Sequence, residues 1–380
     1  MGRFVNPDNS AFQVALNSKI YMDKTGLLEY TNSVLDTPEA YICNSRPRRF
    51  GKSYTANMLA AYYSKGCDSE KMFDGLTIGK SSDFKKHLNK YDVIHIDVQW
   101  FLSSCADIKS IISYITQSVL EELKEYYPEV LPNEVLTLAD ALSRIRNSTG
   151  QKFIVIIDEW DILIRDEATN KAVQEEYIYF LRGLFKGTEP TKYIQLAYLT
   201  GILPIKKEKT QSALNNFDEF TMVSAGTLAP FIGFTEEEVK GLCEEYAMNF
   251  EEVKAWYDGY DLISHSRFGD KRYSIYSPKS VVEAMLRHKF GTYWNRTETY
   301  EALKIYIQMN MDGLKDSVIQ MLAGEGVRIN TGTFSNDMTT FATKDDVLTL
   351  LVHLGYLTYN SETEKVTIPN KDCLLYTSPS

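Results

Sequence analysis

The 380-residue chain has 41 lysines and arginines against 51 aspartates and glutamates, a formal net charge of -10, and 44% hydrophobic residues. A chain of this length and apolar content can bury a sizeable core and is expected to form two or three domains. The acidic balance argues against a protein that coats nucleic acid by overall charge, so any phosphate-binding site must be a local basic patch.

The cysteines and histidines argue against two further classes of protein. Five scattered cysteines without a CxxC pair are typical of a reducing compartment rather than a disulfide framework. Five dispersed histidines form no HExxH motif and no Cys/His cluster, so a metal held by protein ligands alone is not expected. The N-terminus lacks an apolar signal-like segment, and no stretch approaches the ~18 apolar residues of a membrane span. We therefore expect a cytoplasmic protein.

Strand-like and helix-like segments alternate through the N-terminal part of the chain. Apolar runs are separated by segments with helical spacing or helix-ending signals, such as the glycine at Gly66 and the prolines at Pro128 and Pro190. Continuous apolar strands separated by helices predict an α/β fold, a P-loop-type parallel sheet with helices on both faces. The predicted strands are residues 41–45, 91–98, 152–161 and 193–201.

The pattern changes in the C-terminal part of the chain. Thr235 and Glu238 form a predicted capping box, and the segments up to Gly326 are mostly helical with polar connectors. Further on, a capped helix that ends at Gly355 precedes two strands, which suggests a winged-helix-like element. The acidic start of that helix favours a structural role over DNA binding.

The predicted organisation therefore has three parts and a tail. The tail, CLLYTSPS, resembles translated adapter sequence and is expected not to belong to the natural protein. The predicted parts are a P-loop domain over 1–230, a helical module over 231–340, a winged-helix-like element over 341–372 and the non-native tail over 373–380.

A basic loop, RPRRFGKS, follows the first predicted strand and precedes a helix. Gly51, Lys52 and Ser53 match the end of the phosphate-loop pattern GxxxxGK[ST], whereas Arg46 stands at the position of the first glycine. In such loops backbone N–H groups and the helix dipole bind phosphate, the lysine reaches the β and γ oxygens, and the hydroxyl binds Mg2+. A basic surface loop would explain the charges but not the flanking strand and helix. The predicted nucleotide-binding residues are Arg46, Pro47, Arg48, Arg49, Phe50, Gly51, Lys52, Ser53 and Tyr54.

Two polar groups follow other apolar strands. Asp158 and Glu159 end the strand in FIVIIDEWD, at the sheet edge where ligands bind in parallel α/β folds. We predict that Asp158 and Ser53 hold Mg2+ and that Glu159 polarises a water for attack on the γ-phosphate. The alternative is a solvated acidic pair. Thr200 ends the fourth strand and is a candidate sensor that contacts the γ-phosphate or the attacking water, although threonine before glycine is also ordinary turn chemistry.

Together these stretches closely resemble the AAA-ATPase-like family of bacterial proteins, whose members often carry a C-terminal PD-(D/E)XK nuclease-like domain. The resemblance implies an ATP-binding P-loop core and makes Arg46 a family feature. It also implies that the chain ends near the start of a missing nuclease-like domain. Tyr21, Asp23 and Lys24 lie in a region that often packs near the nucleotide base, although a capped helix start explains them equally well. The matching stretches are YMDKTGLLEY, SRPRRFGKS, FIVIIDEWD, YLTGILPIKK, NNFDEF, GFTEEEV, WYDGY and DDVLTLLVHLGYL.

The arginines suggest a further hypothesis. Ring-forming AAA+ proteins usually place an arginine finger after the sensor strand, but no arginine occurs between Arg182 and Arg267, and GILPIKKEKT offers only lysines. Arg48 or Arg49 is therefore a candidate for transition-state charge within the same subunit, a role worth ~10^3 or more in rate. Ion pairing of these arginines with neighbouring carboxylates is an equal alternative.

The sequence thus predicts a protein that binds ATP and Mg2+ and hydrolyses ATP to drive a conformational switch. The switch would act on an unknown protein partner or on the missing C-terminal domain. One alternative is a nucleotide-binding regulatory or scaffold module with negligible turnover, which would have no need of a placed base such as Glu159. Another is a DNA-associated regulator or nuclease subunit, which the net charge does not support.

Overall fold

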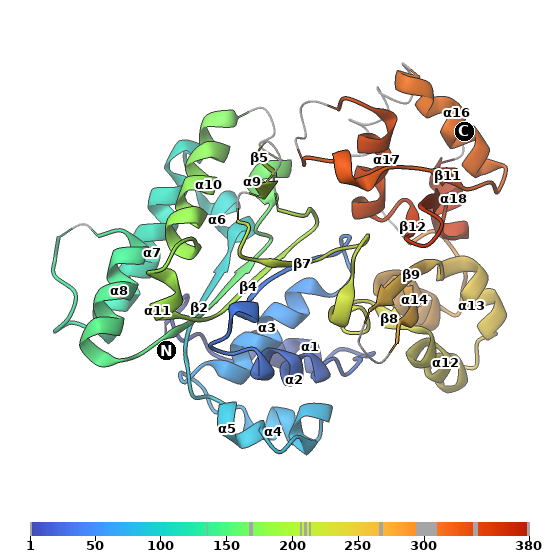
Figure 1. The fold of residues 1–380 in the computed structure, drawn as a ribbon. Helices are drawn as coiled ribbons and strands as arrows, with labels where there is room; N and C mark the ends of the chain where they lie inside the picture. Colours follow the sequence, from blue (N-terminus) through green and yellow to red (C-terminus); the bar gives the residue numbers. More distant parts are fainter. Residues whose placement is uncertain are drawn as a thin grey trace. The chain divides into compact units, whose positions relative to one another are not determined.

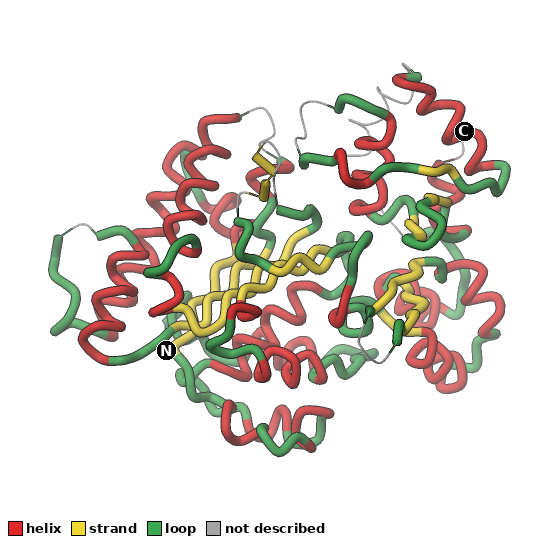
Figure 2. The backbone as a smooth tube through the Cα atoms, in the orientation of Figure 1, coloured by secondary structure: helices red, strands yellow, loops and turns green. Residues whose placement is uncertain are grey.

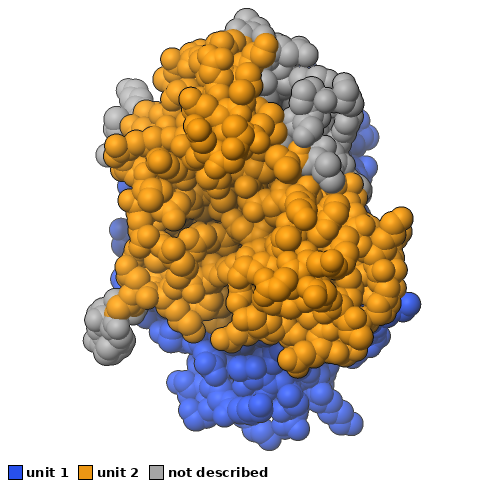
Figure 3. Space-filling view, turned by 90° about the vertical axis from the view of Figure 1, so that its right-hand side faces the viewer, with its two compact units in different colours: residues 1–44, 52–201, 205–219 blue, residues 45–51, 202–204, 220–380 orange. Residues whose placement is uncertain are grey.

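The chain divides into two compact units of dense internal contact, shown in Figure 3. Unit 1 comprises residues 1–44, 52–201 and 205–219, and unit 2 comprises residues 45–51, 202–204 and 220–380. The computed structural model describes residues 2–134, 136–166, 170–205, 207–208, 211–212, 214–265, 269–293, 310–336 and 341–377.

A five-stranded sheet forms the centre of unit 1. The four predicted strands are confirmed, and β2 runs parallel to β3, as β3 does to β4. Figure 2 shows these strands side by side. All six residues of β3 are buried, which explains its continuous apolar sequence. The strands, in the order β2-β3-β4-β1-β7, are β2 (Asp92–Asp97), β3 (Phe153–Asp158), β4 (Ile194–Gly201), β1 (Tyr41–Ser45) and β7 (Asp218–Phe220).

Helices cover both faces of this sheet, as the sequence predicts (Figure 1). On one face, alternate residues such as Val155 and Ile157 enter a large apolar core with the helices α6, α7, α8 and α10. On the other face, α3 packs against β2, β3 and β4, and α1 packs against α3. The helices are α1 (Ser10–Leu16), α3 (Lys52–Tyr63), α6 (Val98–Ser104), α7 (Ile111–Tyr126), α8 (Leu138–Thr149) and α10 (Lys171–Phe185).

Strand β4 lies between the strand before the basic loop and the strand that ends in the acidic pair. Strand β2 lies between β1 and β3 in the sequence, but in the sheet it lies next to β3, on the side opposite β4. The N-terminal segment runs along β2: Val5 forms an antiparallel bridge with Ile94, and the Glu122 carboxylate accepts the backbone N–H groups of Arg3, Phe4 and Val5. This segment covers an otherwise exposed sheet edge.

Asp23 ties the start of α2 (Gly26–Ser33) to the short helix η2 (Thr77–Lys80). One carboxylate oxygen accepts the Thr25 backbone N–H at 2.9 Å and its hydroxyl at 2.6 Å, and the other accepts the corresponding groups of Thr77, both at 2.7 Å. Burial raises the pKa of Asp23, but these bonds outweigh burial and leave the pKa below its ordinary value. These contacts agree with the expectation that Asp23 stabilises the start of a helix, here α2.

The predicted capping box in unit 2 is confirmed at Thr235 and Glu238. The segment predicted to be mostly helical also contains a three-stranded antiparallel sheet, in the order β8-β10-β9. The sequence analysis missed this sheet because its strands are short and only partly apolar. The strands and helices of this part of the chain are β8 (Phe234–Thr235), α12 (Glu236–Glu245), α13 (Phe250–Tyr257), β9 (Tyr260–Ser264), β10 (Lys271–Tyr276) and α14 (Pro278–Arg287).

The predicted helix and two-stranded wing near the end of unit 2 are also present. Helix α17 (Lys344–Leu354) ends at Gly355, and β12 (Thr358–Asn360) pairs antiparallel with β13 (Lys365–Thr367). A third strand, β11 (Val327–Arg328), pairs with β13. The following helix, α18 (Lys371–Thr377), contains the first residues of the predicted non-native tail, whereas residues 378–380 lie outside the described residues.

The remaining elements are short. Among the described residues, every helix is too short or too polar to cross a bilayer. These elements are η1 (Pro38–Ala40), α4 (Glu70–Phe73), α5 (Phe84–His87), η3 (Ile108–Ser110), α9 (Ile162–Arg165), α11 (Pro190–Tyr193), β5 (Lys207–Glu208), β6 (Gln211–Ser212), η4 (Gly226–Leu228), η5 (Met311–Gly313), α16 (Leu314–Leu322) and η6 (Thr331–Thr333).

We predict that Asp23→Asn lowers the urea midpoint at pH 7, by an amount equivalent to about 1–3 kcal/mol, because an amide N–H2 would face donors from Thr77 or Thr25. The folded-state pKa of Asp23 is depressed, so its contribution is present above the unfolded value, near 3.8, and is lost as the pH falls through the folded value. Urea unfolding at pH 7 and at pH 3 measures both effects.

The matched control is Asp83→Asn, because Asp83 is exposed and its side chain makes no capping hydrogen bond to α5. An equal effect of the two substitutions at pH 7 would contradict the role given to Asp23.

Candidate functional site

The basic loop joins β1 to α3, and its backbone requires a glycine. Gly51 has a φ of +93°, a conformation that residues with a side chain rarely adopt. A Cβ at Gly51 would meet nothing within 4 Å, so neighbouring atoms leave room for a side chain. Glycine is therefore favoured here by the backbone conformation and not by lack of space. Helix α3 then begins at Lys52, and the backbone N–H groups of a first helical turn lack partners inside the helix. Such a start favours an anion.

Arg46 and Phe50 anchor the loop within unit 2. The Arg46 side chain is fully buried, and its Nη1 donates to the carbonyl oxygens of Ser45, at 2.9 Å, and Phe220, at 3.0 Å. Phe50 is also buried, and its ring meets that of Tyr260 edge to face, with the centroids 5.3 Å apart. The side chain at the missing-glycine position is therefore part of the packed interior.

The other predicted loop residues differ in exposure. Pro47 is buried, whereas Arg48, Arg49 and Ser53 are exposed, and Tyr54 is exposed by 53%. The lysines at positions 206 and 209, in the segment where an arginine finger was sought, lie outside the described residues.

Asp158 and Thr200 meet at the ends of adjacent strands in unit 1. The parallel register pairs Ile157 with Leu199, so the next residues lie at the same edge of the sheet. The Thr200 hydroxyl donates to Asp158 Oδ1 at 2.8 Å, and the Glu159 backbone N–H donates to the same oxygen at 3.0 Å. Both side chains are buried, Asp158 to 5% exposure and Thr200 completely.

Glu159 leaves the strand with a positive φ of +51°, which is unusual for a residue other than glycine and is a feature that clusters at functional sites. Its carboxylate lies between two cations. Oε1 is 3.8 Å from Lys52 Nζ, and Oε2 accepts a hydrogen bond from Arg165 Nη2 at 2.8 Å. Lys52, Asp158, Glu159 and Thr200 are thus brought together, as their positions in the sequence predict.

Burial raises the pKa of the Glu159 carboxyl above its ordinary value. Lys52 and Arg165 act in the opposite direction, whereas Asp161 and Asp158 add to the increase. A carboxylate with a raised pKa is a stronger base and is suited to polarising a water molecule.

Asp161 and Arg165 are neighbours of Glu159 that the sequence did not predict. Arg165 ends α9, its side chain is 1% exposed, and its Nε donates to Asp161 Oδ2 at 2.9 Å. The spacing of an acid and an arginine four residues apart, directly after the acidic pair, was the available signal.

The end of β2 brings two more polar groups near the site. Asp97 is opposite Asp158 in the sheet register, and its carboxylate caps α6 by accepting the Trp100 backbone N–H at 3.1 Å. Burial lowers the pKa of His95, two residues earlier on the same strand, so its imidazole is neutral at pH 7.

The oxygen groups present fit a magnesium ion. Asp158 Oδ1 accepts two hydrogen bonds, whereas Oδ2 and the Ser53 hydroxyl accept none from the residues that the structure describes. Carboxylate and hydroxyl oxygens suit Mg2+, which usually keeps several waters and binds substrate phosphates. No group of three or more His, Cys, Asp or Glu able to hold a metal occurs in the described ranges.

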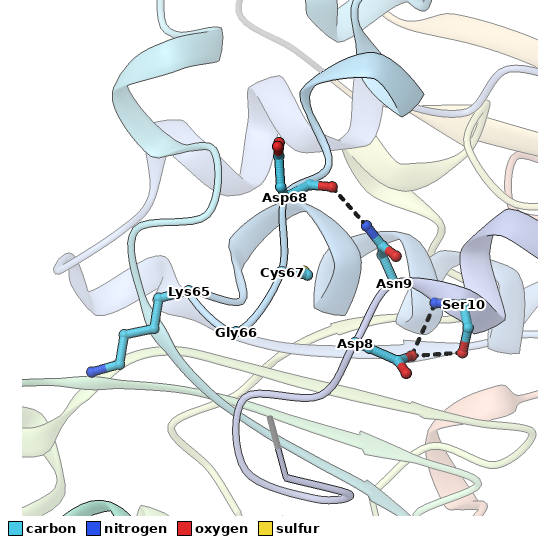
Figure 4. Close-up of a pocket in the computed structure, with 7 residues that line it drawn as sticks. All are labelled: Asp8, Asn9, Ser10, Lys65, Gly66, Cys67 and Asp68. Atoms are coloured by element: carbon cyan, nitrogen blue, oxygen red, sulfur yellow. Dashed lines mark hydrogen bonds between the residues drawn. The ribbon is translucent and has the colours of Figure 1, made fainter.

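A separate surface pocket of unit 1 contains none of these residues (Figure 4). It has a volume of about 440 Å³ and is bordered by residues 8–10 and 65–68. Two of its residues bind each other, because the Asn9 side chain donates to the Asp68 carbonyl at 3.0 Å. The Lys65 amine is directed away from the other labelled groups in Figure 4 and binds the carboxylate of Asp92, outside the pocket, at 2.8 Å. Its chemistry does not match the predicted site.

Known proteins resemble the chain to different degrees. The model of the AAA-ATPase-like family, described as a predicted AAA-ATPase, matches residues 11–210, more than half of the chain. An uncharacterized protein in the vnfD 5' region of Azotobacter chroococcum mcd 1 is 24% identical over 283 residues, which cover 73% of this chain and 51% of that protein. The chain therefore spans about half the length of this curated relative.

Among solved structures, Cdc6p from Pyrobaculum aerophilum is similar at 10% identity, over 98% of this chain and 97% of that one, with a TM-score of 0.31. A similarity of this size carries no conclusion about fold or function.

We predict that Gly201→Ala destabilises unit 1 by about 1–3 kcal/mol, because overpacking forces buried groups apart. A Cβ at Gly201 would lie 2.6 Å from Asp161 Oδ1 and 2.7 Å from Trp160 Nε1, and both side chains are fully buried. Gly183→Ala is the matched control, because a Cβ there meets nothing within 4 Å on the exposed side of α10. We expect this control to stabilise by about 0.5–1 kcal/mol.

Thermal and urea unfolding of the two variants measures the difference. If Gly201→Ala unfolds no more readily than the wild type, the end of β4 is not packed tightly against Asp161.

Proposed function

Because the chain belongs to the predicted AAA-ATPase-like family, we propose that it binds ATP together with Mg2+ and hydrolyses the bond to the γ-phosphate. The meeting of Lys52, Asp158, Glu159 and Thr200 at one edge of the unit 1 sheet carries this proposal. The four residues are linked by the 2.8 Å hydrogen bond from Thr200 to Asp158, the 3.0 Å hydrogen bond from the Glu159 backbone N–H to Asp158, and the 3.8 Å approach of Lys52 to Glu159. Lys52 provides a cation for the phosphates, Asp158 a carboxylate for the metal, and Glu159 a carboxylate for the attacking water.

Lys52 and the start of α3 would bind the phosphates. The Lys52 side chain is 3% exposed and already lies beside a carboxylate, so its amine is held at the site before ATP binds. The first-turn N–H groups of α3 add donors for phosphate oxygens. Ser53 and Asp158 would hold Mg2+, which neutralises charge on the phosphate oxygens when bound.

Glu159 would orient the attacking water and accept its proton. Thr200 would act differently from a direct phosphate sensor. Its hydroxyl has a single proton, and that proton is donated to Asp158. While this bond persists, Thr200 cannot also donate to a phosphate oxygen, so we propose that it holds Asp158 in place.

The biological output belongs to the same proposal. ATP hydrolysis would drive a conformational change that acts on a protein partner or on a further domain of a longer protein, including a nuclease-like domain. The match covers 51% of the Azotobacter relative, which supports action on a further domain of a longer protein. The structure describes all five cysteines, and none of them forms a disulfide, which supports a cytoplasmic location.

We predict that Glu159→Gln retains ATP binding but loses turnover by roughly 10^2–10^4-fold, because the amide cannot accept the water proton. Lys52→Ala is expected to weaken ATP binding at least tenfold and to abolish turnover, because the phosphate cation is removed. Phosphate release and equilibrium binding of a fluorescent ATP analogue, with and without Mg2+, distinguish the two effects. Lys80→Ala, an exposed lysine of η2, is the matched control.

Wild-type binding without measurable turnover would instead support a nucleotide-binding scaffold. Turnover that appears only on addition of DNA would favour the DNA-associated alternative.

We also propose that Arg48 or Arg49 supplies transition-state charge. Both are exposed, and Arg48 makes no ion pair with the part of the chain that the structure describes. Arg49 borders a pocket of about 460 Å³ in unit 2, together with Lys279, Glu283 and Arg287. The Glu283 carboxylate in that pocket supports ion pairing as the alternative for Arg49.

We expect alanine at the arginine that acts to reduce the single-turnover rate by up to ~10^3-fold, with ATP binding retained. Quenched-flow hydrolysis by Arg48→Ala and Arg49→Ala measures this, and wild-type rates in both variants would exclude the role.

A further inference from the structure

Arg165 is a buried arginine whose guanidinium binds three carboxylates. Its Nε donates to Asp161 at 2.9 Å, its Nη2 to Glu159 at 2.8 Å, and its Nη1 to Asp166 at 3.2 Å. The planar guanidinium fixes the directions of its donors, so these bonds also fix the partners relative to one another.

The pair with Asp161 anchors the guanidinium to the sheet. Both side chains are removed from water, with exposures of 1% for Arg165 and 0% for Asp161. Asp161 is itself packed against the end of β4, where a Cβ at Gly201 would lie 2.6 Å from its Oδ1. An isolated buried charge costs several kcal/mol, so the two charges hold each other in place.

The two oxygens of Glu159 have different surroundings because of this anchor. Oε2 is bound to Arg165, whereas Oε1 lies on the side of Lys52, 3.8 Å from its amine. Glu159 leaves β3 with a positive φ, and its carboxylate lies between these two cations. A carboxylate held through one oxygen can present the other in a single direction.

We infer that Arg165 is a positioning residue that holds Glu159 through Oε2, so that Oε1 faces the place where Lys52 binds the terminal phosphates. Asp161 supports it by anchoring the guanidinium. This inference rests on the proposed ATP hydrolysis at Lys52 and Glu159. With only 1% of its side chain exposed, Arg165 would act through Glu159 rather than on ATP itself. Its loss would free the Glu159 carboxylate to pair more closely with Lys52, away from the water that it must orient.

A purely structural role for Arg165 makes a different prediction. If the guanidinium only neutralised Asp161, its replacement would change stability and would affect turnover independently of Glu159. If it acts through Glu159, the two substitutions must be non-additive in the rate of hydrolysis. A double-mutant cycle therefore separates the two roles.

The experiment compares wild type, Arg165→Lys, Glu159→Gln and the double variant in single-turnover ATP hydrolysis. Lysine keeps the buried positive charge but cannot bind Glu159 and Asp161 through a fork. We expect Arg165→Lys to slow hydrolysis roughly 10^2-fold, as misplaced catalytic groups do, with ATP affinity changed by less than about threefold. The double variant should be no slower than Glu159→Gln alone.

Arg144→Lys is the matched control, because Arg144 makes an exposed ion pair with Asp140 at the same spacing of four residues. If Arg165→Lys does not fold, Asp161→Asn serves instead, because it loosens the anchor and leaves Arg165 and Glu159 unchanged. We expect it to slow hydrolysis at least tenfold, again with no further loss in the Glu159→Gln background.

The outcomes separate this inference from the function on which it rests. A normal rate in Arg165→Lys, or an equal loss with and without Glu159→Gln, overturns the positioning role alone. A wild type without turnover, or a Glu159→Gln variant with the wild-type rate, overturns the proposed function and the positioning role with it.

Discussion

The parallel pairing of β3 with β4 is the constraint on which the candidate site depends. The register sets Ile157 beside Leu199, and this places Asp158 beside Thr200 at the edge of the sheet. Successive side chains of a strand point to opposite faces, so a slip by one residue would turn Asp158 into the apolar core that surrounds Val155. The buried aliphatic residues of β3 thus determine where the polar groups of the site can lie.

Those polar groups must also balance one another's charge, because most of them are buried. Two buried carboxylates, Asp158 and Asp161, and the partly exposed Glu159 lie near two buried cations, Lys52 and Arg165. Each cation has a carboxylate within ion-pair distance, which offsets part of the desolvation cost. The surplus of negative charge favours a divalent cation, and the exposed Ser53 hydroxyl is a suitable further ligand.

The sequence predicted the parts of this arrangement that depend on local pattern. Apolar runs marked the four strands, and the polar residues at or after the ends of three of them marked Lys52, Asp158, Glu159 and Thr200 as neighbours. The partners of Arg165 were not predicted, because an acid and an arginine four residues apart are common on exposed helices. The sheet of β8, β10 and β9 was missed because short, half-buried strands show only a weak alternation of apolar and polar residues.

Arg46 shows most clearly where local pattern fails. A side chain at the first glycine position of a phosphate loop is compatible with a ligand only if it is directed elsewhere. Arg46 meets this condition, because its guanidinium is buried and donates to the carbonyl oxygens of Ser45 and Phe220. Phe220 is 174 residues after Arg46 in the chain, so a short sequence motif cannot reveal this contact. The departure from the usual pattern is thus compensated by tertiary structure, while Gly51 keeps a backbone conformation that residues with a side chain rarely adopt.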